Sequence, residues 1–338
     1  MINNLRIVPY TEEDNEPALI LESKCVQGKS LVLKYQRPTF HARSQVYDRY
    51  KIFCAKLDNQ LVGIQAWAEK KVILHKKLIR CTYLYDLRVH PNYRKQGIGT
   101  YLLQTAINEI GKETDCTYTL VAGENESALN LSKFLTGSTV SIPLTYLVIP
   151  VNKKHSGKNE YQTVSANDTH DRYFKLNNDI EFLPEFDEKK LLGFVSSIAI
   201  GKTADAGCSM WTNENLLAEQ VVSVPFYYRL MKILPAPLRQ FMNLPYIPKP
   251  TDTILSWFLF DFYAKDEKSA GNLLATVNHI ALNQNRQYFY MLLQNNNPLL
   301  TFIKKSYNKT YTFPYLFLAL GRLVPSQKEK LYIDIRDL

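Results

Sequence analysis

Residues 86–103 read Asp-Leu-Arg-Val-His-Pro-Asn-Tyr-Arg-Lys-Gln-Gly-Ile-Gly-Thr-Tyr-Leu-Leu. The stretch before them, residues 78–89, is rich in Thr, Tyr, Ile and Val and therefore predicts a strand. Pro91 has no N–H for a sheet and ends it. Apolar residues then recur at the helical period, which predicts an amphipathic helix ending near Gly111 (Ile98, Leu102, Leu103, Ala106, Ile107 and Ile110). The sequence thus predicts a strand, a glycine loop and a helix in direct succession.

Gly97 and Gly99 form the only Gly-x-Gly of the chain. Glycine permits a positive φ, and the free N–H groups of such a loop and of the first helical turn attract anions. Arg94 and Lys95 add positive charge beside it. The dinucleotide fingerprint would need a third glycine where Leu102 stands, and the Gly-Lys-Ser/Thr of a P-loop is absent. Two interpretations stay open: an anion cradle, or a turn that only lets the helix pack on the sheet.

The other patterns of the first 151 residues predict a strand–helix alternation. A strand, a capped helix, a hairpin, a strand, a helix and an extended segment are expected at 5–9, 11–22, 51–67, 118–122, 125–135 and 141–151. Strand, helix, strand in this order implies a right-handed crossover between parallel neighbours. This predicts an α/β (mixed α+β) fold, with a central twisted mixed sheet flanked by helices.

The second half repeats this order. Residues 152–172 are polar and predict a linker. Beyond them a strand, a helix, a strand and a helix are expected at 254–263, 270–283, 288–293 and 295–305, at the spacing of the first half. We therefore predict two similar domains, 1–151 and 173–338.

The strand and glycine loop together resemble the acetyl-CoA motif of the GNAT acetyltransferase superfamily, and Asn125 with Ala128 matches that family's Asn-x-x-Ala. The resemblance covers residues 5–150 and implies acetyl-CoA as co-substrate. It implies that the strand splays at Leu87, Arg88 and Val89 to pair with the pantetheine arm, and that the loop holds the pyrophosphate. The cofactor-binding residues implied are Leu87, Arg88, Val89, Arg94, Lys95, Gln96, Gly97, Ile98, Gly99, Thr100 and Asn125.

The catalytic groups are less defined. Tyr83 and Tyr85 alternate on one face of the predicted strand and Asp86 on the other, so these three are candidates for base or proton donor, or else ordinary sheet residues. The family's usual acid, a tyrosine, is replaced by Ser132. Three alternatives stay open. The thiolate of CoA leaves unprotonated, Tyr146 protonates it, or this domain is a weak catalyst.

The whole chain resembles the Hookless-type N-acetyltransferases of plants in a series of short motifs in the same order (Glu22, Cys25 and Gly28; 182–187; 191–194; 209–211; 333–337). At the second copy of the glycine loop stand Asp266 and Glu267, whose charge repels phosphate. The second domain is therefore predicted to bind no CoA and to cover the acceptor cleft. The proline-rich segment 225–250 is a lid, an amphipathic helix or a packed connection.

Composition excludes several functions. The net charge of +9 is spread evenly, which disfavours a nucleic-acid binder, and no apolar run is long enough to span a membrane. The five cysteines form no Cys-x-x-Cys and the histidines no metal-binding pair, so we expect no metal and a cytoplasmic location. The predicted function is acetyl transfer from acetyl-CoA to a primary amine; the alternatives are an idle acyl-CoA-binding protein and an enzyme for a longer acyl-CoA.

Overall fold

The computed structural model describes residues 4–28, 31–110, 114–132, 139–201, 203–226, 246–307 and 310–338. The side chains of Ser132 and Thr139 lie outside this description. Most of the proline-rich segment 225–250 also lies outside it, so its three interpretations stay open.

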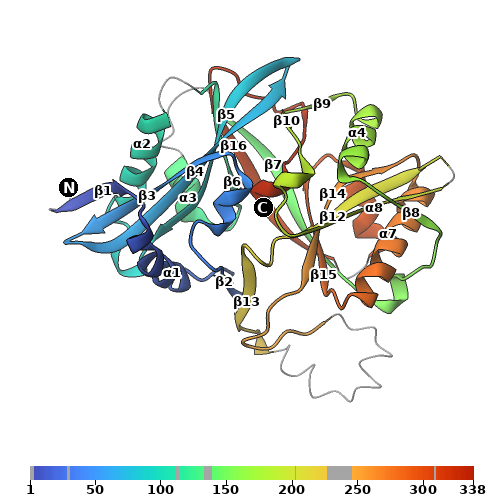
Figure 1. Ribbon diagram of the computed structural model, residues 1–338, viewed down its shortest axis with the longest axis horizontal. Helices are drawn as coiled ribbons and strands as arrows, with labels where there is room; N and C mark the ends of the chain where they lie inside the picture. The colour runs from blue at the N-terminus through green and yellow to red at the C-terminus, as the bar shows by residue number, and fades with distance from the viewer. Residues whose placement is uncertain are drawn as a thin grey trace.

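One large mixed sheet runs through both halves (Figure 1). Its strand order is β1-β3-β4-β5-β6-β16-β7-β15-β14-β12-β11-β8, with β10 beside β4. The strands of the first half are β1 (Leu5–Pro9), β3 (Arg49–Leu57), β4 (Gln60–Leu74), β5 (Lys77–Val89), β6 (Cys116–Ala122) and β7 (Thr139–Pro150). Those of the second half are β8 (Tyr161–Val164), β10 (Leu183–Pro184), β11 (Phe194–Ile200), β12 (Ala206–Thr212), β14 (Ser256–Ala264), β15 (Tyr288–Gln294) and β16 (Tyr311–Gly321).

All but one of the α-helices in the described ranges lie where the sequence predicts them; the exception, Ala166–Leu176, begins inside the segment expected to be a linker. The first half carries α1 (Asn15–Ser23), α2 (Ile98–Ile110) and α3 (Glu126–Ser132), and the second carries α4 (Ala166–Leu176), α7 (Glu267–Asn283) and α8 (Pro298–Ser306). Within the sheet, β5 runs parallel to β6 and β14 parallel to β15, while the other pairs are antiparallel. The order β5-α2-β6-α3-β7 thus recurs as β14-α7-β15-α8-β16, which confirms the predicted repeat.

The two repeats exchange their last strands. β16, from the second half, lies between β6 and β7 of the first and pairs with both. β7 in turn pairs with β15 of the second half. Neither half therefore forms its part of the sheet alone, and the sheet is continuous across the predicted domain boundary.

The segment 152–172 is part of the fold, and the prediction of a linker there is wrong. It contains β8 and the first part of α4, and β8 pairs with β11 at the end of the sheet. The segment is polar because β8 is an edge strand whose side chains are mostly exposed. Composition alone does not separate such an edge strand from a linker.

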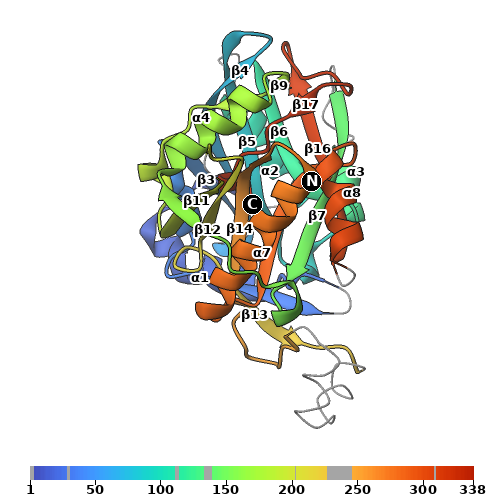
Figure 2. The same cartoon turned by 90° about the vertical axis from the view of Figure 1, so that its right-hand side faces the viewer.

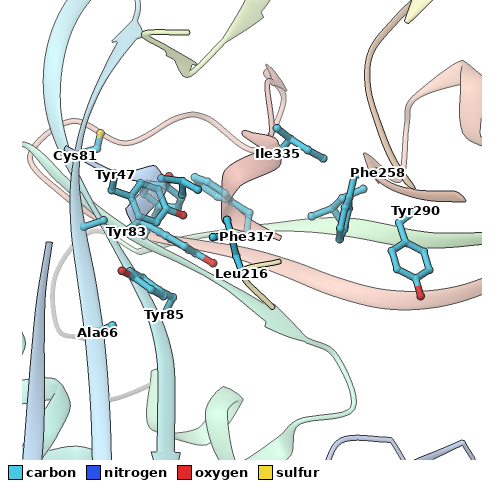
Figure 3. Packing of buried hydrophobic residues seen from close by; sticks show 14 of the residues in the cluster. Tyr47, Ala66, Cys81, Tyr83, Tyr85, Leu216, Phe258, Tyr290, Phe317 and Ile335 are labelled. Carbon is cyan, nitrogen blue, oxygen red and sulfur yellow. The ribbon is translucent and has the colours of Figure 1, made fainter. Parts of the chain in front are cut away.

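The sheet has two apolar faces of different make-up. On one, α2 covers the first half and α7 with α8 cover the second, each over its own core (Figure 2). On the opposite face a single core continues from one half to the other (Figure 3). Aromatic residues dominate that shared core, among them Tyr83, Tyr85, Tyr118, Phe317 and Tyr290.

The shared face is covered by segments from both ends of the chain. α1 and the 3-10 helix Ala42–Val46 pack there from the first half, and the C-terminal Ile335–Asp337 turn packs there from the second. A two-stranded ribbon of β2 (Val32–Gln36) and β13 (Ala218–Ser223) joins the halves below the centre in Figure 1. A third small sheet pairs β9 (Ile180–Glu181) with β17 (Lys330–Leu331).

Candidate functional site

Strands β5 and β6 pair over a short stretch and then separate. Their parallel register covers residues 81–83 and 116–118. Beyond it β5 continues beside β4 alone, and β6 continues beside β16. No described strand pairs with the β6 side of β5 from Leu84 to Val89. The backbone groups on that edge are therefore placed to pair with an extended ligand, as the resemblance implies for Leu87, Arg88 and Val89.

A β-bulge at Asp86 widens this opening. Gln65 of β4 lies opposite both Asp86 and Leu87, and Asp86 has a φ of 53°. Aspartate is one of the few residue types that tolerates this left-handed conformation. The buried Gln65 amide donates to the carbonyl oxygens of Tyr85 (2.7 Å) and Ala66 (2.9 Å), which stabilises the irregular backbone.

The glycine loop, residues 94–100, lies between the end of β5 and α2. Gly97 has a φ of 83°, and a Cβ placed there would meet no atom within 4 Å. The turn is therefore open on the side where Gly97 lies. The N–H groups of Ile98, Gly99 and Thr100 precede the N–H of Tyr101, which donates the first hydrogen bond of the helix to the Gly97 carbonyl, so they have no partner inside the helix. The exposed side chains of Arg94, Lys95 and Gln96 surround this helix end.

Gly99 has a different role from Gly97. A Cβ at Gly99 would contact Leu131 of α3 at 3.6 Å and Val89 and Leu87 of β5 at 3.7 and 4.0 Å. Ile98, which is 1% exposed, anchors the start of α2 in the core. The packing interpretation of the motif therefore describes Gly99, whereas the open turn at Gly97 suits an anion. The anion-cradle interpretation of Gly97 stays a prediction.

Asn125 begins helix α3. Its side-chain oxygen accepts a hydrogen bond from the Ala128 N–H at 3.1 Å, and its carbonyl accepts one from Leu129. This is helix capping. A contact between Asn125 and a cofactor stays a prediction.

Asp86 lies in a buried network of charges. Its carboxylate accepts from Arg37 at 2.9 Å, Arg43 at 3.3 Å and Arg88 at 3.4 Å. Arg37 also forms a two-pronged ion pair with Glu22. Burial alone would raise the pKa of Asp86, but the three guanidinium groups hold it well below its usual range. Asp86 is therefore a poor proton acceptor, and its geometry suits positioning of the arginines.

Tyr83 and Tyr85 are buried and stacked on each other, with ring centroids 5.2 Å apart. Tyr83 donates to the backbone oxygen of Asp337 and Tyr85 to the Ser44 hydroxyl, both at 2.7 Å. Burial raises the pKa of both hydroxyls. The bulge turns Asp86 so that its carboxylate and the Tyr85 ring both contact Arg43. The prediction that Asp86 and the two tyrosines face opposite sides of the sheet is wrong, because it assumes a regular strand.

The two candidates for the acid lie on other elements. Ser132 is the last residue of α3, and its side chain lies outside the described part of the structure. Tyr146 of β7 packs beside Tyr290 and Tyr315 with centroids 5.4 and 5.5 Å away. Burial raises the pKa of Tyr146 well above its ordinary value.

A second buried ionic cluster fastens the C-terminal segment to the sheet. Lys70 of β4 pairs with Asp334 (2.5 Å) and Asp337 (2.8 Å), and Tyr118 donates to Asp337 at 2.7 Å. A small cavity lies against these groups and is also lined by Leu120 and Phe317. Charged and apolar residues therefore both line this cavity.

One carboxylate near the centre has no counterpart in the sequence analysis. Glu219 of β13 lies directly across the ribbon from Tyr35 of β2, and it accepts a hydrogen bond from Tyr290 at 2.7 Å. No sequence motif surrounds Glu219. It is brought to the sheet by pairing between segments far apart in the chain, which periodicity does not predict.

The second copy of the loop is closed. α7 begins at Glu267, soon after β14 ends at Ala264, and the Asp266 carboxylate accepts from the Ser269 N–H at 2.7 Å. A carboxylate already caps this helix end. That supports the prediction that the second half binds no CoA through this loop.

Two further observations concern metal binding and membrane-spanning helices. No group of three or more His, Cys, Asp or Glu in the described ranges could hold a metal ion. Across the same ranges, no helix has the length and apolar character needed to cross a membrane. The cytoplasmic location stays a prediction.

Comparison with known proteins adds to this geometry. Residues 12–135 match the model of the Acetyltransferase (GNAT) family. No curated protein matches the chain. The resemblance to Hookless-type proteins receives no support from these comparisons and stays a prediction.

Solved structures show a similar fold over nearly the whole chain. N-myristoyltransferase of Saccharomyces cerevisiae with bound myristoyl-CoA is 11% identical, has a TM-score of 0.63 and covers 95% of this chain and 80% of its own. A candidate acetyltransferase of Pyrococcus horikoshii is 10% identical, has a TM-score of 0.56 and covers 98% and 92%. The match of residues 12–135 and the likeness over the whole length together support a GNAT-type fold for this chain.

Proposed function

We propose that this protein transfers an acetyl group from acetyl-CoA to a primary amine by direct attack in a ternary complex. The observation that carries the proposal is the splay of β5 from β6 beside the open turn at Gly97. An unpaired strand edge and an adjacent helix end suit the two parts of CoA, an amide-bearing arm and a pyrophosphate.

Each part of the cofactor has its own residues in this proposal. The backbone of Leu87, Arg88 and Val89 pairs with the pantetheine arm. The N–H groups of residues 96–100 receive the pyrophosphate, with Arg94 and Lys95 adding positive charge, and Asn125 lies at the start of the next helix.

The reaction needs little besides orientation. The amine nitrogen attacks the thioester carbon, the C–N bond forms and the C–S bond breaks, and the ammonium proton passes to a base. Holding the two reactants together can supply about 7–11 kcal/mol of the barrier. Tyr83, Tyr85 and Asp86 hold Arg43 and the bulge in place, and Tyr146 or solvent protonates the thiolate.

In this proposal the two halves of the chain have different roles. Residues 1–151 bind acetyl-CoA, and residues 173–338 complete the sheet and cover the acceptor side. β16, lying between β6 and β7, gives the second half a direct place beside the thioester.

A longer acyl group is a second candidate, because the yeast structure of similar fold contains myristoyl-CoA. We favour acetyl because residues 12–135 match the model of the Acetyltransferase (GNAT) family.

Calorimetric titration with acetyl-CoA, CoA and myristoyl-CoA, together with release of CoA thiol in the presence of amines, tests the proposal. We expect one site per chain for acetyl-CoA and thiol release that depends on the amine. Tighter binding of myristoyl-CoA would replace acetyl by the longer acyl group. Binding without turnover of any amine would leave an idle acyl-CoA-binding protein.

A further inference from the structure

Four tyrosines surround Glu219 at the junction of the two halves. They are Tyr35 of β2, Tyr146 of β7, Tyr290 of β15 and Tyr315 of β16, and with Glu219 they form what we name the tyrosine cage. Tyr290 donates to one Glu219 oxygen, and Tyr146 packs against both Tyr290 and Tyr315. The cage is thus built from three strands of the main sheet and from the ribbon that crosses it.

The carboxylate of Glu219 can accept more hydrogen bonds than the described residues donate to it. Within the described ranges its only recorded hydrogen-bond donor is the Tyr290 hydroxyl. Glu219, Tyr35, Tyr146 and Tyr315 are each partly exposed to solvent. A carboxylate flanked by aromatic faces is the arrangement that binds an ammonium group, through charge and through cation–π attraction.

The cage also lies next to the place where the thioester is expected. Tyr35 contacts the guanidinium of Arg88, which is 5.8 Å from its ring centre. Arg88 is on the free part of β5, directly after the bulge. Tyr35 thus neighbours both Arg88 of the proposed cofactor edge and, across the ribbon, Glu219, and Tyr315 lies on β16, which pairs with β6.

From this geometry we infer that Glu219 binds the ammonium of the acceptor and receives its proton, and that the acceptor is a small primary monoamine with an apolar body. This inference rests on the proposed function and names the acceptor class for that same site.

Charge near the cage argues for one ammonium rather than several. The groups beside Tyr35 are Arg43, Arg88 and Asp86, and Arg37 with Glu22 lies behind them. Three arginines against two carboxylates leave one positive charge, which Glu219 balances. A polyamine would bring further positive charges toward these arginines and bind less well, whereas tyrosine rings favour an alkyl or aryl body.

Protonation of Glu219 is consistent with a base. Burial raises its pKa, and the hydrogen bond from Tyr290 opposes that rise. The other titratable groups facing it are the hydroxyls of Tyr35, Tyr146, Tyr290 and Tyr315, whose pKa values are themselves raised by burial. Glu219 is therefore the group of the cage whose pKa lies above the ordinary range of a carboxyl and below that of the tyrosine hydroxyls.

The test uses the full chain, acetyl-CoA and three amines: 2-phenylethylamine, hexylamine and spermidine. For the wild type we expect kcat/KM for each monoamine to exceed that for spermidine at least about tenfold. Glu219→Gln should lower kcat/KM for the monoamines about 100-fold, in the range of general-base catalysis, and abolish the acid limb of the pH profile. Affinity for acetyl-CoA should stay within about twofold.

Two further variants separate chemistry from folding. Tyr290→Phe keeps the ring but removes the donor, so the acid limb of the pH profile should move to higher pH. Gln220→Ala, on the opposite face of β13, is the matched control and should leave the profile unchanged. Glu219→Asp should recover part of the activity that Glu219→Gln loses.

The outcomes are distinct. If Glu219→Gln and Tyr290→Phe transfer acetyl at the wild-type rate with the wild-type pH profile, the cage is not the acceptor site although the proposed function stands. Preference for spermidine would overturn the acceptor class. If the wild type acetylates none of the amines, the proposed function fails and this inference fails with it.

Discussion

Asp86 and Asp261 occupy the same place in the two halves of the protein. Each lies a few residues beyond the short stretch where its strand pairs in parallel with a neighbour. At each site the aspartate and the next residue together lie opposite one residue of the antiparallel neighbour, which is a β-bulge. Both aspartates have a left-handed φ, 53° for Asp86 and 49° for Asp261. Their partners differ. Asp86 pairs with three arginines, whereas Asp261 binds His170 at 2.9 Å and Tyr332 at 2.8 Å. The bulge therefore belongs to the shared fold, and only in the first half do arginines pair with its aspartate in the described ranges.

Replacing Asp86 by Asn tests its structural role. The change leaves Arg37 and Arg43 without a full counter-charge in a buried site, which costs about 3–5 kcal/mol. We expect the free energy of unfolding in urea to fall by this order. The matched control is Asp48→Asn, since Asp48 is exposed and pairs only with Lys190 at the surface. A loss below about 1 kcal/mol at Asp86 would show that the network is not strongly coupled.

The same carboxylate predicts a pH dependence of stability. The pKa of Asp86 is lowered in the folded state, so its contribution to stability is present above its unfolded pKa of about 3.9 and is lost as the pH falls below it. Between pH 5 and pH 3 the wild type should lose more stability than Asp86→Asn does. Parallel curves for the two proteins, measured by urea unfolding, would contradict this assignment.

Gly97 offers a sharp test of the proposed pyrophosphate site. Asn tolerates a positive φ and adds no charge, whereas Asp has nearly the same shape and a negative charge. We expect Gly97→Asp to weaken acetyl-CoA binding at least about tenfold more than Gly97→Asn. Calorimetry measures both, and thermal unfolding reports whether the fold is retained. Equal affinities would remove the glycine loop from the phosphate site.

The second half should tolerate loss of Asp261 without loss of cofactor binding. Asp261→Asn removes the carboxylate that His170 and Tyr332 share, so the melting temperature should fall. The affinity for acetyl-CoA should not change, because the loop before α7 is closed by Asp266. A loss of affinity in a variant that melts at the wild-type temperature would assign a cofactor role to the second bulge.

The sequence predicts the elements of this protein better than their pairing. The periodicity of residues 98–110 and the β-rich run 78–89 are local, and both elements lie where they are expected. The place of β16 between β6 and β7 is decided by long-range contacts that no local pattern contains. The same holds for β8, whose polar side chains resemble those of a linker.

Prediction of the site from the sequence fails where the backbone is irregular. The glycine loop is predicted because its residue types are themselves unusual. The bulge at Asp86 is not, and it reverses the side on which the carboxylate lies. Glu219 is missed for another reason: its partners Tyr35 and Tyr290 come from distant parts of the chain, and a single Glu in a β-rich run carries no signal.

The exchange of β7 and β16 has a consequence for how the chain reaches its native state. Each half contributes one strand, β7 or β16, whose hydrogen-bonding partners on both sides come from the other half. A nascent first half would expose the edge of β6 until residues 311–321 had been synthesised. We therefore expect a single cooperative unfolding transition for the whole chain. Two separately expressed halves should be aggregation-prone alone and recover the fold when they are produced together.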